Sequence, residues 1–233
     1  MLYAEGIQKQ FLRKRKDSNV FEAVQETTLE IANGKITVIH GRSGSGKSTL
    51  LNMLSGILKP TRGRVLLGET DLYQLDDVRR ALLRNEKFGV VPQGQSAIYS
   101  LNVLENVLLP FTMYEKRTKQ SGDLQEARRR AEALLSATGL QELRDVFPQE
   151  LSGGELRRMA IARALMMKPE IVFANEPTED LDDSNTKVVL KLFEDAAKNG
   201  CAVLIVTHDN SVFPYANVLL RMDDGKLKEE KDV

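Results

Sequence analysis

The chain has 233 residues, enough for one large domain, or for a core with a subordinate lobe, and for a sizeable buried interior. Its 33 Lys and Arg residues balance its 33 Asp and Glu residues, so no overall field attracts nucleic acid, and we predict no nucleic-acid partner. The longest uninterrupted apolar run, Cys201 to Val206, has six residues, which excludes a membrane span of roughly 18 residues. With one cysteine and no secretory pattern among its first residues, the chain is expected in a reducing cytosol.

The first part of the chain predicts two short antiparallel strands, followed by a strand, a loop and a helix. Residues 2–7 and 20–31 have the pattern of strands, and the polar stretch Arg13 to Asn19 predicts a charged loop between them. The apolar stretch 36–40 then meets a glycine-rich turn and a helical run over 47–58, which Pro60 is expected to stop.

The middle of the chain predicts helices, and the last part predicts parallel strands. From Asp123, apolar residues recur at helical spacing until Gly139, where a helix is expected to end. Later, the short apolar runs 171–174 and 201–206 flank a helical segment over 184–198, an alternation typical of parallel strands with crossover helices. A strand, a turn and a strand over 217–229 follow. The residues therefore predict an α/β pattern with a helical insertion from about residue 94 to residue 165.

Residues 41–48 read GRSGSGKS, the G-x-x-x-x-G-K-[ST] pattern, between a predicted strand and a predicted helix. Glycines let successive backbone N–H groups point inward, and the helix N-terminus adds partial positive charge, so the loop fits a polyphosphate. We expect Lys47 to reach the β- and γ-phosphates and Ser48 to ligate Mg²⁺. This loop alone leaves a kinase, a GTPase, a recombinase and a transporter motor open.

A second motif decides among these classes. Residues 151–155 read LSGGE, and LRRMAIARAL follows. Together with the loop at 41–48, this motif resembles the signature of the ATP-binding-cassette ATPases, and the resemblance covers nearly the whole chain in the order of the family's motifs. The resemblance implies an α/β fold in which a P-loop NTPase core carries an N-terminal antiparallel β-subdomain and an inserted α-helical subdomain. We expect the first part of the nucleotide-binding core, with the β-subdomain, over 1–93, the helical subdomain with the signature motif over 94–165, and the second part of the core over 166–233.

The signature motif is itself a candidate anion site. Ser152 is expected to cap the helix that follows, and Gly153 and Gly154 leave the first amides of that helix open. The resemblance implies that this site faces the γ-phosphate held by another copy, so that a head-to-tail homodimer encloses two ATP molecules. It implies nucleotide contacts from Gly41, Arg42, Ser43, Gly44, Ser45, Gly46, Lys47, Ser48, Thr49, Ser152, Gly153, Gly154, Glu155 and Asp182.

Three further residues match single positions of the family. Gln93 follows a predicted short strand and matches the Q-loop glutamine, whose amide oxygen can approach Mg²⁺ and the attacking water. His208 ends an apolar strand and resembles the switch histidine that contacts the γ-phosphate. Phe11 lies where the family has an aromatic residue that stacks on adenine, although Phe21 or Tyr3 could take this role.

The chain departs from the family where an apolar strand should end in Asp-Glu, because it has Asn175 and Glu176 there. Asparagine keeps an acceptor oxygen for the metal but loses the negative charge, which favours weaker Mg²⁺ binding. The carboxylate of Glu176 can still accept a proton or orient water. The extra acids Asp182 and Asp183 could restore part of the field at the metal. The resemblance implies a catalytic set of Lys47, Gln93, Glu176 and His208, and a metal set of Ser48, Gln93 and Asn175.

The resemblance also implies a membrane partner. Residues 98–111 are too continuously apolar for a free amphipathic helix. They resemble the corresponding segment of ATPases that serve lipoprotein-release, macrolide-efflux and antimicrobial-peptide-resistance exporters. We therefore expect a separate integral membrane permease, an exporter, with this chain peripheral on the cytoplasmic face of the membrane. Tyr99, Leu101, Val103 and Leu104 are expected to line the docking groove. The basic runs 13–16 and 128–130 could contact lipid headgroups, although such runs are more often solvated.

Two functions stay open on the sequence. The first is a cytoplasmic ATP hydrolase that dimerises on ATP and drives a permease. The second is a slow or regulatory ATP-dependent clamp that signals to a membrane partner, and Asn175 is its direct support. A small-molecule kinase would leave LSGGE unexplained.

Overall fold

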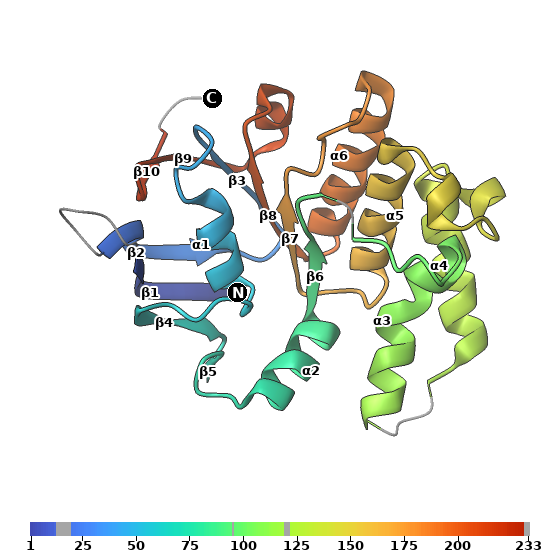
Figure 1. The fold of residues 1–233 in the computed structure, drawn as a ribbon, viewed down its shortest axis with the longest axis horizontal. Helices are drawn as coiled ribbons and strands as arrows, with labels where there is room; N and C mark the ends of the chain where they lie inside the picture. Colours follow the sequence, from blue (N-terminus) through green and yellow to red (C-terminus); the bar gives the residue numbers. More distant parts are fainter. Residues whose placement is uncertain (13–19, 95, 119–121, 231–233) are drawn as a thin grey trace.

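The computed structural model describes residues 1–12, 20–94, 96–118 and 122–230 (Figure 1). The loop predicted over 13–19, including the basic run 13–16, lies outside the described residues. The described strands form a four-stranded sheet in the order β2-β1-β4-β5 and a six-stranded sheet in the order β10-β9-β3-β8-β7-β6. In Figure 1 the four-stranded sheet lies at one end of the molecule and helices α3 and α4 lie at the other.

The four-stranded sheet contains the first strands of the chain. Its strands are β1 (Leu2–Leu12), β2 (Val20–Ile31), β4 (Arg62–Leu67) and β5 (Thr70–Asp71). Each pairs with its neighbour antiparallel, which confirms the antiparallel pairing predicted for the start of the chain. Strand β1 is longer than predicted, because it continues past residue 7 to Leu12, whereas β2 has the predicted bounds.

The six-stranded sheet is the centre of the fold. Its parallel strands are β3 (Ile36–His40), β6 (Phe88–Val91), β7 (Ile171–Asn175), β8 (Ala202–Thr207) and β9 (Val218–Asp223), and β10 (Lys226–Glu229) pairs antiparallel with β9. All residues of β7 and β8 are buried, as expected for parallel strands covered on both faces. This arrangement confirms the parallel strands predicted for the last part of the chain.

Helices cover both faces of this sheet. Helix α1 (Lys47–Leu54) packs between the two sheets, and α6 (Asp183–Lys198) packs on the opposite face of the six-stranded sheet (Figure 1). The helix predicted over 47–58 ends at Leu54. Gly56 has a φ of 71°, in the left-handed region that ends helices. The 3₁₀ helix Asn210–Tyr215 follows β8.

A helical region lies between β6 and β7 in the chain. It comprises α3 (Val103–Thr118), α4 (Leu124–Ala137), the 3₁₀ helices Gln141–Leu143 and Pro148–Glu150, and α5 (Gly153–Leu165). Asp123 caps α4 by accepting hydrogen bonds from the N–H groups of Gln125 and Glu126, which confirms the predicted helix start. Helix α2 (Asp77–Lys87) precedes β6 and packs beside α3.

Helix α5 belongs to two cores at once. Ile161 and Leu165 pack with the six-stranded sheet and α6, whereas Leu156 and Met159 pack with α3 and α4. Helix α5 therefore joins α3 and α4 to the six-stranded sheet. None of the described helices has both the length and the apolar character needed to cross a membrane.

Candidate functional site

The glycine-rich loop at 41–46 joins β3 to α1 and packs closely against neighbouring backbone. A Cβ atom on Gly41 would lie 2.1 Å from the Met222 carbonyl oxygen, and one on Gly46 would lie 2.2 Å from the Ala23 carbonyl oxygen. Gly46 also has a φ of 106°, which other residues rarely adopt. Only glycine fits both positions, as the pattern in the sequence predicted.

Lys47 begins α1 with a buried ammonium group. Its side chain donates hydrogen bonds to the carbonyl oxygens of Gly41 at 2.7 Å and of Arg42 at 3.0 Å. Burial lowers the pKa of Lys47, and the negative charge of Glu176 acts in the opposite direction. The ammonium group is therefore held in place by neutral oxygens, and a polyphosphate could bind to it.

Asn175 ends β7 beside the start of α1. The Ser48 hydroxyl donates a hydrogen bond to Asn175 Oδ1 at 3.3 Å. In the part of the chain that the structure describes, no three His, Cys, Asp or Glu residues gather into a metal site. A cation at this point would therefore depend on the Ser48 and Asn175 oxygens and on the oxygens of a bound phosphate.

Glu176 follows Asn175 and is held from two sides. Its Oε2 atom accepts hydrogen bonds from the Thr207 hydroxyl at 2.8 Å and from the backbone N–H of His208 at 3.2 Å. Its Oε1 atom lies 3.0 Å from Nδ1 of His208. This hydrogen bond and the charge of Glu176 raise the pKa of His208. The carboxylate is thus buried and fixed, whereas 68% of the His208 side chain is exposed.

A cavity of about 620 Å³, called here the phosphate cavity, brings Lys47, Ser48, Glu176 and His208 together, whereas Asn175 is not among its described lining residues. Phe11 and Phe21, which are paired across β1 and β2, line the same cavity as the glycine-rich loop. The described residues that line it are Phe11, Phe21, Ala23, Ser43, Gly44, Gly46, Lys47, Ser48, Thr49, Gln93, Glu176, Glu179 and His208.

Most residues predicted for phosphate, adenine and catalysis therefore face one cavity. Gly41, Arg42 and Ser45 belong to the same loop but are not among the described lining residues. Tyr3 is not among them either, so Phe11 and Phe21 are the aromatic candidates. Two participants were missed by sequence reasoning. Thr207 holds Glu176, and Glu179 lines the cavity wall.

The signature motif borders a second cavity, of about 640 Å³, called here the signature cavity. Ser152 caps α5 as predicted, because its hydroxyl accepts a hydrogen bond from the N–H of Glu155 at 3.3 Å. The Glu155 carboxylate in turn accepts the Ser152 N–H at 2.7 Å, and hydrogen bonds from Ser152 lower the pKa of Glu155. The described lining residues are Ser152, Gly153, Gly154, Glu155, Arg158, Asp180, Leu181, Asp182 and Asn185.

The phosphate cavity and the signature cavity lie at separate places on the surface of the chain. The described residues that line one do not line the other, and the segment after β7 runs from Glu179 at the first to Asp180 at the second. Asp182 caps α6 by accepting a hydrogen bond from the N–H of Asn185 at 2.7 Å, and this bond lowers the pKa of Asp182. Asp182 thus lies with the signature motif, and Asp183 begins α6. Glu179, not these two acids, brings additional negative charge to the phosphate cavity.

A glycine-rich loop between a parallel strand and a helix, with a buried lysine behind it, defines a P-loop nucleotide-binding protein. Comparison with known families is more specific, because the family described as ABC transporter matches residues 24–179. The chain belongs to the ABC transporter family and is an ATP-binding subunit of an ABC transporter.

Relatives match over the whole cassette. The lipoprotein-releasing system ATP-binding protein LolD of Buchnera aphidicola subsp. Schizaphis graminum is 37% identical over 233 residues, covering 100% of this chain and 98% of LolD. The ABC transporter ATP-binding protein YtrE of Bacillus subtilis is 36% identical, covering 92% and 91%. The dimeric bacterial ABC transporter cassette MJ0796 aligns at a TM-score of 0.89 with 31% identity over 100% of both chains. MJ0796 has also been solved as a dimer in a post-hydrolysis state with ADP and Pi.

Proposed function

We propose that this chain hydrolyses ATP and that a homodimer, formed on ATP binding, drives a separate integral membrane permease that exports its substrate. The observation that carries the proposal is the buried carboxylate of Glu176, which Thr207 and His208 hold at the wall of the phosphate cavity. A carboxylate in this position can orient water or accept its proton as the water attacks the γ-phosphate. The similarity to LolD supports an exporter on the cytoplasmic face of the membrane.

The neighbouring side chains suggest how ATP would bind. Lys47 would exchange its carbonyl contacts for phosphate oxygens, and Phe11 or Phe21 would stack on adenine. His208 is exposed, and its hydrogen bond with Glu176 and the charge of that carboxylate raise the pKa of its ring. A protonated imidazole attracts the γ-phosphate, so ATP would compete with Glu176 for His208.

A magnesium ion would bind where Ser48, at the wall of this cavity, meets Asn175, and the neutral amide gives this site less negative charge than an aspartate would. Ser48 and Asn175 offer two adjacent oxygens, and Gln93 lines the cavity with an amide. Mg²⁺ would neutralise charge on the β- and γ-phosphates. Because Asn175 is neutral, the site lacks an attraction whose gross size is about 4 kcal/mol per unit charge pair at 4 Å and an effective dielectric of 20.

Separation of the two cavities supports the homodimer. Ser152 and Gly153 are exposed at the N-terminus of α5, where another copy can reach them. A helix N-terminus attracts negative charge, so the signature cavity of one copy fits the γ-phosphate bound by the other. The dimeric cassette MJ0796 supports the same arrangement.

Steady-state phosphate release and size-exclusion chromatography test this proposal. The wild-type chain should release phosphate from ATP, and Glu176→Gln should lose at least about a hundredfold of that rate. Because Glu176→Gln keeps the binding groups, it should elute as a dimer with ATP and as a monomer without nucleotide. A wild-type chain that neither releases phosphate nor dimerises with ATP would contradict the proposal.

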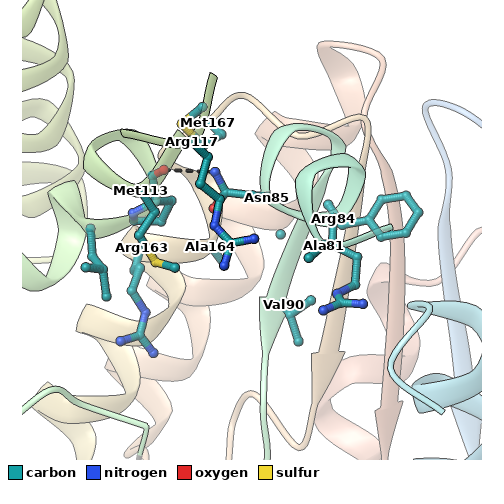
Figure 2. Close-up of a pocket in the computed structure, with 13 residues that line it drawn as sticks. Ala81, Arg84, Asn85, Val90, Met113, Arg117, Arg163, Ala164 and Met167 are labelled. Atoms are coloured by element: carbon teal, nitrogen blue, oxygen red, sulfur yellow. Dashed lines mark hydrogen bonds between the residues drawn. The ribbon is translucent and has the colours of Figure 1, made fainter. Parts of the chain in front are cut away.

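Of the four residues predicted to line the docking groove, Val103 and Leu104 belong to the core, whereas Tyr99 is exposed. Val103 is fully buried in the core with α4 and α5 and cannot line a groove, and Leu104 packs against the same core. A groove of about 370 Å³ instead lies between α2 and α3 (Figure 2). A hydrogen bond from Asn85 to the Pro110 carbonyl oxygen crosses it at 3.0 Å. Its described lining residues are Ala81, Arg84, Asn85, Phe88, Gly89, Val90, Leu109, Pro110, Met113, Arg117, Arg163, Ala164 and Met167.

Charge and shape favour one kind of occupant for this groove. Three arginines line it, and the described lining residues include no carboxylate. Burial lowers the pKa of Arg84 and of Arg163, so both would gain from an acidic partner. We therefore propose that a short cytoplasmic segment of the permease docks here through an acidic side chain and apolar neighbours.

Substitutions in the groove test this docking surface. Met113→Glu should reduce co-sedimentation with membranes of the cell that expresses the chain. The new carboxylate would lie in the groove and repel the acidic side chain of the permease that is proposed to bind there. Val78→Glu is the matched control, since Val78 is an exposed apolar residue of α2 outside the groove. Equal co-sedimentation of both variants would contradict the proposal.

The alternative function is a slow, regulatory ATP-dependent clamp. Asn175 supports it, because a weakened magnesium site slows hydrolysis more than ATP binding. ATP-dependent dimerisation of the wild-type chain without phosphate release would favour the clamp over the transport motor.

A further inference from the structure

The signature cavity is proposed to receive a phosphate, yet most of its charged side chains are negative. Its described lining residues carry three carboxylates and one guanidinium, which belong to Glu155, Asp180, Asp182 and Arg158. The N-terminus of α5 attracts an anion, whereas a carboxylate beside it repels one. The affinity of this cavity for a phosphate therefore depends on which carboxylate lies closest to the open amides of α5.

Two of the three carboxylates are engaged in holding helix starts. The carboxylate of Glu155 accepts a hydrogen bond from the N–H of Ser152 at 2.7 Å, and that of Asp182 accepts one from the N–H of Asn185 at 2.7 Å. Asp180 differs from both, because its carboxylate makes no hydrogen bond or ion pair with any other residue that the structure describes. Its charge is therefore not compensated within the described chain.

Asp180 lies directly against the glycine pair of the signature motif. A Cβ atom on Gly153 would lie 3.7 Å from Asp180 Cβ and 3.8 Å from Asp180 Oδ2. A Cβ atom on Gly154 would lie 3.3 Å from the Asp180 carbonyl oxygen. These glycines begin α5, and the first amides of a helix have no partner within it. The free carboxylate is thus beside the amides that a phosphate would reach.

The backbone at Asp180 permits a test that removes the charge alone. Asp180 is exposed and has a φ of 67°, in the left-handed region that Asp and Asn enter more readily than most residues. Asparagine has nearly the shape of aspartate and tolerates the same turn. Asp180→Asn therefore keeps the path of the chain and takes away the negative charge.

We propose that Asp180 is a regulatory residue of the signature cavity, whose carboxylate repels the γ-phosphate presented by another copy and so weakens closure of the ATP-bound homodimer. The carboxylate is fixed in the chain, so every closure must overcome this repulsion. The inference rests on the proposed function, and it adds the residue that limits the affinity of one copy for the other.

Sedimentation equilibrium of the Glu176→Gln chain with ATP measures the affinity of the dimer without turnover. Adding Asp180→Asn should lower the dissociation constant of the ATP-bound dimer about tenfold, because both signature cavities lose a repelling charge. Asp183→Asn is the matched control. Asp183 is an exposed acid of the same segment and is not among the described lining residues of either cavity. Its removal should change the dissociation constant by less than about twofold.

Salt distinguishes a lost repulsion from a changed turn. In about 1 M NaCl the Debye length falls to about 3 Å, so the advantage of Asp180→Asn over the Glu176→Gln parent should shrink to about threefold or less. A gain that came from altered packing would persist at this salt concentration.

Binding of inorganic triphosphate to the monomer tests the charge without a dimer. The Lys47→Ala chain is the background, because its phosphate cavity is disabled, and the backbone N–H shifts of Gly153 and Gly154 report on the signature cavity. Asp180→Asn should bind triphosphate at least about threefold more tightly than the Lys47→Ala parent, and Asp183→Asn should match that parent.

Several results would overturn the role of Asp180. These are equal dimer dissociation constants for Asp180→Asn and Asp183→Asn, or an advantage that persists undiminished in about 1 M NaCl. If no variant forms a dimer with ATP, the proposed function is contradicted, and the triphosphate titration decides by itself. Equal affinities of the two variants, or unchanged shifts of Gly153 and Gly154 in Asp180→Asn, would then overturn the inference.

Discussion

Asn175 places a neutral amide beside Ser48, at the position where the family pattern has a negatively charged aspartate. One substitution can restore that charge. We expect Asn175→Asp to lower the magnesium concentration for half-maximal ATP hydrolysis about tenfold, which corresponds to a net gain of about 1.4 kcal/mol after solvation. The turnover number should also rise. Asn175→Ala is the control, because it removes the oxygen as well as the charge and should weaken the metal dependence. No gain in rate or in Mg²⁺ affinity would refute the claim that Asn175 limits the chemistry.

Two phenylalanines compete for adenine at the mouth of the phosphate cavity. The chain has no tryptophan, so a single Phe→Trp substitution gives a fluorescence signal from one position. We expect the emission of Phe11→Trp to change when ATP binds, because the indole stacks on the base. Inorganic triphosphate, which lacks the base, should leave the emission unchanged. A response of Phe21→Trp in place of Phe11→Trp would assign the stacking to Phe21.

The contact between His208 and Glu176 makes a small part of the stability depend on pH. The folded pKa of His208 is raised above 6.5, so the contribution is complete below the unfolded pKa and is lost as pH rises through the folded pKa. Because 68% of the side chain is exposed, solvent screening keeps the contribution under about 1 kcal/mol. Urea unfolding at acidic and alkaline pH should show this loss in the wild type and not in His208→Gln. Equal pH dependence of the two proteins would contradict it.

Residues within contiguous motifs could be predicted from the sequence, and residues joined only by folding could not. Ser48 and Lys47 follow the glycine-rich loop directly, so the pattern identifies both. The hydrogen bond between Thr207 and Glu176 joins residues 31 positions apart, and Arg157 reaches Pro92 across 65 positions. An isolated threonine or arginine carries no signal of such a contact.

At the scale of elements, the glycine-rich loop gives the sharpest test of local packing. Gly46→Ala would place a Cβ against the Ala23 carbonyl oxygen, whereas Gly44→Ala would meet no heavy atom of the described chain within 4 Å. Both glycines have positive φ, so both alanine variants should lose about 1–2 kcal/mol of unfolding free energy. Overpacking should cost Gly46→Ala a further 1–3 kcal/mol, approximately, and ATP binding as well. Equal losses in urea unfolding would show that the close approach is unimportant.

Elements with strong apolar patterns were predicted, and elements without them were not. The parallel strands β7 and β8 are buried throughout and appear in the sequence as continuous apolar runs. Helix α2 is amphipathic, but most of its residues are polar and none is fully buried, so no apolar run marks it in the sequence. The edge strand β5 has two residues, too few for any pattern. The docking expectation failed at Val103 for a related reason, since an apolar residue gives no indication of whether it faces the core or a partner.

For the whole molecule, the separate cavities predict that each ATP site needs two copies of the chain. Lys47→Ala disables the phosphate cavity. Ser152→Asp keeps a residue that caps helices well but places negative charge at the signature cavity, so it should repel the γ-phosphate. Each variant alone should therefore hydrolyse little ATP. Ser152→Asn is the control, because it keeps the cap without the charge.

Mixing the two variants distinguishes shared sites from sites built within one chain. In a mixed dimer, one site combines both defects and the other combines an intact phosphate cavity with an intact signature cavity. Random pairing makes about half of the dimers mixed, so an equimolar mixture should recover about a quarter of wild-type phosphate release if the sites act independently. Sites completed within one chain would give no recovery, since every chain in the mixture carries a defect. A mixture as inactive as its components would therefore contradict the shared site.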